Sequence, residues 1–376
     1  MVPIVTWLRP LALLCALVLA LAACGEGEQG SPPSSQPEAT PAPGTEDADS
    51  PPDGSSSRDA PPEEAEEGVD EEPDAPDDEV AGDDPEPATA HPEPIEPPAP
   101  YVSVEGEVRP NAKRLAARIA EGLTTYEVED EPAEVVAEVA GGALAEQFLD
   151  DAAPLLHEDA WSRGRVVYPQ LGGMLQDATS VMVVIEQTVG LPDGTLVEQT
   201  RTLDVRLAME DGNWILDGLA SAGGEPVPRP DDLPDEAVAV LEDERIDLPD
   251  SAVWDIHRGI VHEDLLTLMT RMADRIPYGV VVLDTGHPWE IFGTDRQSKH
   301  TMGQAVDIHW IGDEDGRLVI QDRQEGSATH ELVRWIYDQP ELSEVGSPWA
   351  LDGFGGRSFT DQLHQDHLHI GVADRS

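Results

Sequence analysis

Histidine and aspartate residues gather in two short segments near the C-terminal end of the chain. One segment contains His300 and Asp307, and the other is a run of three histidines, His364, His367 and His369. Neutral imidazoles and a carboxylate are good zinc ligands, and three protein ligands leave a fourth position for water. A water molecule held in this way can attack an amide whose carbonyl the metal polarises. The pattern therefore predicts a hydrolytic zinc site.

Cysteine cannot contribute to this site. The two cysteines, Cys15 and Cys24, both lie near the N-terminus. No thiolate ligand or disulfide framework is therefore available to the folded part of the chain.

The elements that must position the histidines are short strands. Residues 305–311 alternate in character, so that Asp307 and His309 point to one face of a strand. On a terminal strand His367 and His369 share one face in the same way. Two such strands would present a carboxylate and imidazoles to one cleft. The loop around Gly303 would let His300 turn back over that cleft.

This arrangement resembles a known family. The spacing His-x6-Asp followed by a late His-x-His is similar to the LAS peptidases, which include lysostaphin, D-alanyl-D-alanine carboxypeptidases and the hedgehog signalling domain. The fuller match, over about Ile256–Val372, is to the penicillin-insensitive murein endopeptidases, whose terminal motif reads His-x-x-His-x-His. The resemblance implies an α+β domain in which helices pack on a small antiparallel sheet.

The resemblance also implies roles for single residues. Carried over position by position, the zinc ligands are His300, Asp307 and His369. His367 is then the catalytic base or oxyanion stabiliser, with a role in orienting a metal ligand as the alternative. His364 is a supporting active-site residue.

The roles of three neighbouring residues remain undecided from the sequence. His309 could touch the site, pack in the core or make a hydrogen bond behind a ligand. His287 could line the substrate groove or only pack in its loop. Asp366 lies where the carboxypeptidase branch has a glutamate base, but on a strand it would face away from the cleft.

The N-terminus has the pattern of an export signal. The apolar run 11–21 is the right size for the hydrophobic part of a signal peptide. It ends in Leu-Ala-Ala-Cys-Gly, which resembles the lipobox of bacterial lipoproteins, so residues 1–23 are expected to be removed and Cys24 to be lipidated. We expect a protein that is exported and anchored to the outer face of the cytoplasmic membrane, or located in the periplasm.

The rest of the chain divides into three further parts and the peptidase domain. Residues 24–100, in which 24 carboxylates stand against one arginine, predict a disordered acidic, Pro-rich spacer. Residues 101–225, helices followed by long strands, are similar in architecture to the cone-shaped α+β domains of the nuclear transport factor 2-like group, without visible chemistry. Residues 226–240 predict a linker. The metallopeptidase domain is expected at 241–376, with helices over 251–276 and 329–337.

The net charge and the expected location together reduce the number of functions to consider. The formal net charge of −55 excludes nucleic acid as a partner. We expect a membrane-tethered zinc metallopeptidase that hydrolyses amide bonds of peptidoglycan stem peptides or cross-links. The alternatives are a D,D- or L,D-carboxypeptidase and an inactive metal-containing module that binds peptidoglycan.

Overall fold

The computed structural model describes residues 91–373, apart from 142–144, 314–315 and 354. The described residues all belong to one compact unit. The expected signal peptide, Cys24 and most of the acidic spacer lie outside the described residues. Within the described part, no helix is long and apolar enough to cross a membrane.

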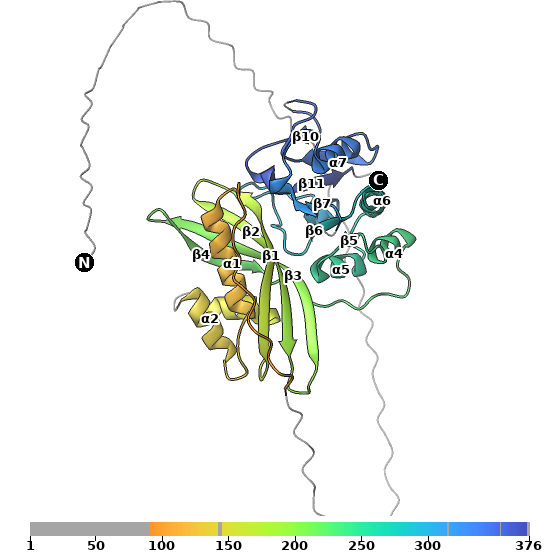
Figure 1. Ribbon diagram of the computed structural model, residues 1–376. Coiled ribbons are helices and arrows are strands. Elements are labelled where there is room, and N and C mark those ends of the chain that lie inside the picture. The colour runs from red at the N-terminus through yellow and green to blue at the C-terminus, as the bar shows by residue number, and fades with distance from the viewer. Residues whose placement is uncertain (1–90, 142–144, 314–315, 354, 374–376) are drawn as a thin grey trace, which may run out of the picture. The chain divides into compact units, whose positions relative to one another are not determined.

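The first half of the compact unit is a group of helices followed by a four-stranded antiparallel sheet (Figure 1). The helices are α1 (Pro110–Thr124), α2 (Pro132–Ala140), α3 (Ala145–Ala152) and a 3₁₀ turn at Ala153–Leu155. The strands are β1 (Trp161–Met174), β2 (Ala178–Gly190), β3 (Leu196–Glu210) and β4 (Asn213–Ser221), paired in chain order. This is the element order expected for residues 101–225.

The second half contains a mixed sheet of shorter strands with helices around it. Its strands are β5 (Ile246–Asp247), β6 (Tyr278–Val282), β7 (Ala305–Ile311), β8 (Arg317–Leu318), β9 (Leu342–Gly346), β10 (Ser358–Phe359) and β11 (Leu368–Val372). Its helices are α4 (Asp235–Leu241), α5 (Asp250–His257), α6 (Glu263–Ala273) and α7 (Ala328–Tyr337), with 3₁₀ turns at His300–Met302, Val319–Gln321 and Leu363–Gln365. The strand expected at 305–311 and the two helical regions are confirmed, and the fold class is α+β. The expectation of a small antiparallel sheet is wrong in one respect, because the pairs β5–β6 and β9–β10 are parallel and make the sheet mixed.

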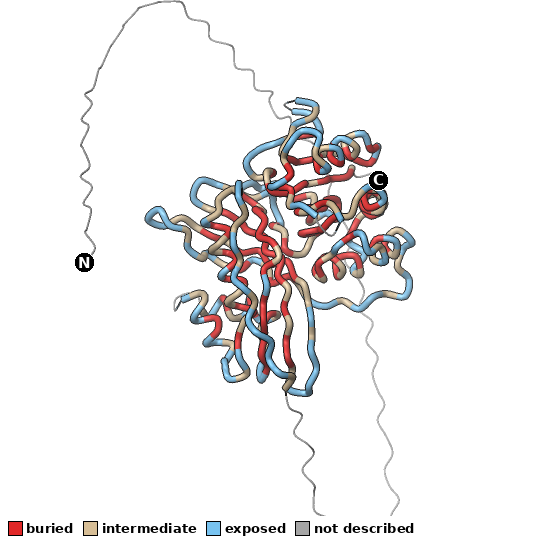
Figure 2. The backbone as a smooth tube through the Cα atoms, in the orientation of Figure 1, coloured by how far each residue is buried: buried red, intermediate tan, exposed pale blue. Residues whose placement is uncertain are grey.

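Strand β2 is buried on both faces. Val181, Val183 and Ile185 face α1 and belong to the core of the first half. Met182 and Val184 point the other way and pack against Val281 and Val282 of β6. A strand covered on both sides needs apolar side chains at every position, which explains its unbroken apolar run. Figure 2 shows this buried chain running through the middle of the compact unit.

Strand β1 is the long element that the sequence pattern does not predict. Its 14 residues include Gly164, Pro169, Gly172 and Gly173, which weaken a strand pattern. Its pairing with β2 shifts register twice, between Val166 and Tyr168 and again between Leu171 and Gly173. Each shift breaks the alternation of faces, so the strand has no simple period of two.

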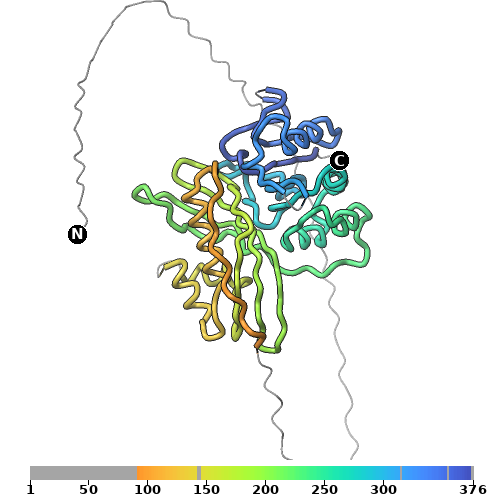
Figure 3. The backbone as a smooth tube through the Cα atoms, in the orientation of Figure 1, coloured from red at the N-terminus to blue at the C-terminus, as the bar shows by residue number. Residues whose placement is uncertain are grey.

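Ordered chain begins before residue 101, where the domain was expected to start. The carbonyl of Pro92 accepts a hydrogen bond from the indole of Trp161 at 2.7 Å, and that of Ile95 accepts one from Arg163 at 2.8 Å. Composition assigned 91–100 to the spacer because it is rich in proline and polar residues. Its carbonyls nevertheless find donors along β1. The trace in Figure 3 follows this segment to α1.

The core of the first half predicts a stability effect. Leu203 of β3 is fully buried among aliphatic side chains, so Leu203→Ala should lower the free energy of unfolding by about 2–5 kcal/mol. Ile215 of β4 is 40% exposed, and Ile215→Ala should change it much less. Chemical denaturation of both variants checks this. Equal losses would contradict the assignment of Leu203 to the core.

Candidate metal centre

The register of two neighbouring strands brings two of the predicted ligands together. Strands β7 and β11 pair antiparallel with Asp307 directly opposite His369. His369 Nδ1 lies 3.0 Å from Asp307 Oδ1. The opposite faces of the same strands carry Val306, Ile308 and Ile370, which belong to the core of the second half.

A tight turn adds the third predicted ligand. His300 begins the 3₁₀ turn before β7, and its Nε2 lies 3.1 Å from His369 Nδ1 and 3.2 Å from Asp307 Oδ1. The turn ends at Gly303, whose φ of +68° is a left-handed conformation that favours glycine. A Cβ at this position would lie 1.8 Å from the carbonyl oxygen of Ile260. Glycine therefore allows the turn to place His300 over the strands.

The hydrogen bonds determine which ring nitrogens carry protons. His300 Nδ1 lies 2.7 Å from the carbonyl oxygen of Leu283, which can only accept, so Nδ1 donates and Nε2 has a free lone pair. His369 Nε2 lies 3.1 Å from a carboxylate oxygen of Glu344 and donates to it. When both rings are neutral, three acceptor atoms, one each from His300, His369 and Asp307, thus face one another.

These acceptor atoms repel one another unless a positive charge lies among them. Burial by itself would raise the pKa of Asp307, but the neighbouring His300 and His367 hold it well below its usual range. Burial would likewise lower the pKa of His369, but hydrogen bonds to Asp307 and Glu344 raise it to about 9. Without a metal the group therefore retains a proton.

The spacing of the three atoms also fits a metal ion. Ligand atoms of a tetrahedral zinc ion with bonds of about 2.0–2.2 Å lie roughly 3.4 Å apart. The three separations here are 3.0, 3.1 and 3.2 Å. A free ring nitrogen whose partner nitrogen donates to a carbonyl or carboxylate is the usual state of a metal-binding histidine.

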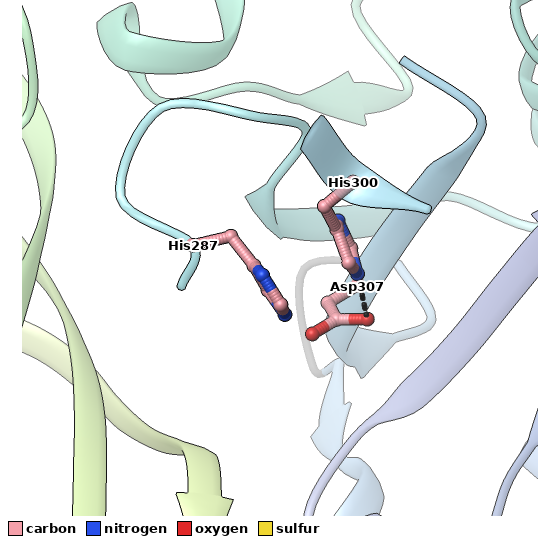
Figure 4. A group of neighbouring side chains, drawn as sticks. All are labelled: His287, His300 and Asp307. Carbon is pink, nitrogen blue, oxygen red and sulfur yellow. Dashed lines mark ion pairs between the residues drawn. The ribbon is translucent and has the colours of Figure 1, made fainter. Parts of the chain in front are cut away.

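His287 joins this group from the loop after β6. Ligand atoms of His287, His300 and Asp307 all lie within 4.8 Å of one another, so these three could hold a metal ion (Figure 4). The rings of His287 and His300 are stacked, with centroids 4.0 Å apart and planes 16° apart. His287 in this position covers the ring of His300.

His367 reaches the same centre from just before β11. The terminal strand begins at Leu368, so the bonds of His367 rather than strand pleating set its orientation. Its Nδ1 lies 2.6 Å from Asp366 Oδ1, and its Nε2 lies 3.7 Å from Asp307 Oδ2. Nδ1 thus donates to a carboxylate while Nε2 faces the predicted ligands.

His364 lies beside His367 but has different hydrogen-bond and ring contacts. Its Nδ1 lies 2.8 Å from Asp361, and its ring meets the ring of Phe359 edge to face. Burial is the main cause that lowers the pKa of His364, so the ring is neutral near pH 7. The structure brings His364 to the site as a neutral neighbour, and the ring centroids of His364 and His367 lie 5.0 Å apart.

A cavity of about 770 Å³ opens over the centre. Predicted site residues on its wall are Asp307, His364, His367 and His369. The remaining wall includes residues 171–174 at the end of β1, the loop side chains Ile291, Phe292 and Arg296, and residues 359 and 361–363. Both halves of the compact unit therefore contribute to the cavity.

The first half contributes a contact that sequence reasoning missed. Gln170 of β1 is fully buried, and its Nε2 donates to Asp307 Oδ2 at 2.6 Å. His309, which shares a face with Asp307, stacks on Tyr168 of β1 with ring centroids 5.5 Å apart. His309 is thus a packing residue, and burial lowers its pKa to about 3. Gln170 lies in β1, which the sequence pattern does not predict, so nothing in the sequence indicated that Gln170 would contact the site.

The other missed contact is Glu344 on β9. Burial would raise the pKa of this carboxyl, but the hydrogen bond to His369 lowers it, so Glu344 stays ionised. Nothing in the local sequence distinguishes Glu344 from the other acidic residues of this very acidic chain.

Comparison with known proteins gave no match to a protein family, a curated protein or a solved structure.

The raised pKa of His369 predicts a pH dependence of stability. An unfolded histidine has a pKa of about 6.5, whereas folded His369 holds its proton to about pH 9. The stabilisation is therefore present below about pH 6.5 and is lost as the pH rises through about 9. In metal-free protein the free energy of unfolding should fall over this window, as chemical denaturation at several pH values would show.

Two variants sharpen this measurement. His369→Gln should remove the fall, because the proton-holding ring is gone. His364→Gln should leave it in place, because the lowered pKa of His364 acts only on the acid side. A fall that persists in His369→Gln would show that another group holds the proton.

Proposed function

We propose that residues 241–376 form a zinc metallopeptidase that hydrolyses amide bonds in peptidoglycan stem peptides or cross-links. The observation that carries the proposal is the convergence of three acceptor atoms, from His300, Asp307 and His369, within 3.0–3.2 Å of one another. Such a set favours a divalent cation, and nitrogen and oxygen donors with an open side suit zinc.

The residues around the centre can carry out an amide hydrolysis. A bound zinc ion would polarise the amide carbonyl and acidify a water molecule. His367 Nε2 faces the ligands and can take a proton from the attacking water, and the same nitrogen can return a proton to the leaving amine. Asp366 holds the other ring nitrogen of His367 at 2.6 Å and keeps the ring in the matching tautomer.

Peptidoglycan as substrate rests on three supports. The His-x6-Asp and His-x-x-His-x-His spacings are similar to those of the penicillin-insensitive murein endopeptidases. The cavity of about 770 Å³ is large enough for a peptide segment. The expected export signal and lipid anchor would place the protein where this substrate lies.

Cleavage of defined muropeptides tests the proposal. Protein lacking the first 80 residues is incubated with cross-linked muropeptide dimers, with and without a chelator, and the products are separated by chromatography. Monomers that appear only in the presence of metal support an endopeptidase. Release of a terminal D-alanine alone indicates a carboxypeptidase. No cleavage of any muropeptide, with metal bound, would leave a binding module.

Single variants separate metal binding from chemistry. His300→Ala and Asp307→Ala should lose bound zinc, measured by elemental analysis after dialysis, together with activity. His367→Ala should keep zinc and lose about 100-fold or more in kcat, because its proton-transfer group is gone. Full activity of His367→Ala would refute its role as the base.

A histidine outside the site provides the control. His262 caps the N-terminus of α6, where its side chain accepts a hydrogen bond from the backbone of Asp264. Asparagine is also a good N-cap, so His262→Asn should keep both zinc and activity.

The location of the protein is tested separately. Cys24→Ala should move the protein from the membrane fraction to the soluble exported fraction, because an acylated cysteine is the proposed anchor. Immunoblots of fractionated cells measure this. Unchanged partitioning would show that Cys24 does not anchor the chain.

A further inference from the structure

A fully buried lysine lies behind the histidine proposed as the base. Lys113 is on α1, in the first half of the compact unit, and its side chain has no exposed surface. Its Nζ lies 2.6 Å from Asp366 Oδ2 and 3.2 Å from the hydroxyl of Tyr168, and it forms an ion pair with Glu107. A buried ammonium group is costly unless it is paired and hydrogen-bonded, and all three partners are in place here.

The two oxygens of Asp366 have separate partners. Oδ2 accepts from Lys113, with the backbone NH of Leu171 at 3.4 Å. Oδ1 accepts from Nδ1 of His367 at 2.6 Å. The carboxylate thus links the lysine to the imidazole.

Neighbouring charges keep Asp366 ionised. Burial would raise the pKa of Asp366, but the charge of Lys113 lowers it to about 2. An ionised Asp366 can only accept, so it requires a proton on Nδ1 of His367. The lone pair of His367 then remains on Nε2, which faces the predicted metal ligands.

We propose that Lys113 is a positioning residue of the centre, acting on His367 through Asp366. Helix α1 is then part of the active site rather than of a separate spacer or binding module. The proposal rests on the proposed hydrolytic function for its kinetic readout, but the orientation of His367 can be measured without any turnover.

The competing explanation is that the buried charges only stabilise the fold. A buried ion pair is weak evidence for stability, because an apolar pair of similar volume often serves as well. The ion pair with Lys113 instead fixes the carboxylate of Asp366, the residue that precedes His367 in the chain. A positioning role predicts that loss of Lys113 affects His367 more than loss of its other charged partner does.

The chain offers a matched pair of variants for this test. Lys113→Met and Glu107→Gln both break the buried pair between Lys113 and Glu107, but only Lys113→Met removes the contact with Asp366. In the described contacts, Glu107 does not touch His367 or the cavity wall. Arg118→Met, which removes an exposed cation from the same helix, controls for the change in net charge.

Kinetics and metal content are measured on the same samples. For Lys113→Met we expect one zinc per chain, a KM within about threefold of the parent and a kcat lower by about 10- to 100-fold, the usual range for loss of a group behind a site. Glu107→Gln and Arg118→Met should each change kcat by less than about threefold. Equal losses of kcat in Lys113→Met and Glu107→Gln would overturn the proposal.

A spectroscopic measurement covers the case in which no turnover is found. Nitrogen-15 spectra of the histidine rings should show His367 protonated at Nδ1 in the parent and as a mixture of tautomers in Lys113→Met. An unchanged His367 signal would refute the positioning role, whereas absent turnover with a changed signal would refute only the hydrolase. If Lys113→Met does not fold, the double variant Lys113→Met/Glu107→Gln is measured instead, because it leaves one buried carboxylate fewer without a partner. Its His367 signal is then compared with that of Glu107→Gln.

Discussion

The convergence of two imidazole lone pairs and a carboxylate oxygen is the interaction on which the rest of the site depends. The antiparallel register that sets Asp307 opposite His369 brings them to 3.0 Å, and the turn ending at Gly303 adds His300. Like partial charges at this distance repel unless a cation lies among them. The surrounding contacts, to Leu283 and Glu344, turn the remaining ring protons outward and so preserve the convergence.

The two sheets meet at the centre with both apolar and polar contacts. Away from the centre, Met182 and Val184 of β2 pack on β6 as in any apolar core. Near the centre, β1 contributes Gln170 and Tyr168, which contact Asp307 and His309. The two halves are therefore joined by individual polar and ring contacts where chemistry is proposed, and by ordinary apolar packing elsewhere. The first half, which shows no chemistry of its own in sequence, supports the second.

The sequence allowed prediction of those parts of the structure that depend on local pattern. Strand β7, helix α7 and the α5–α6 pair follow from periodicity, and the face shared by Asp307 and His309 follows from strand parity. Strand β1 did not follow, because its glycines, its proline and its two register shifts remove the period. Gln170 and Lys113 were missed for a further reason. Their importance arises only from contacts between residues more than 130 positions apart.

The spread of the site along the chain has a consequence for the timing of assembly. Lys113 lies on α1 and His369 on β11, far apart in the sequence, so the group is incomplete until these two segments have folded together. Contacts of such long sequence separation form late, because loop closure must precede them. Metal capture would then report completion of folding. A chain in which these segments have not yet met would lack the arrangement that is proposed to hold the metal.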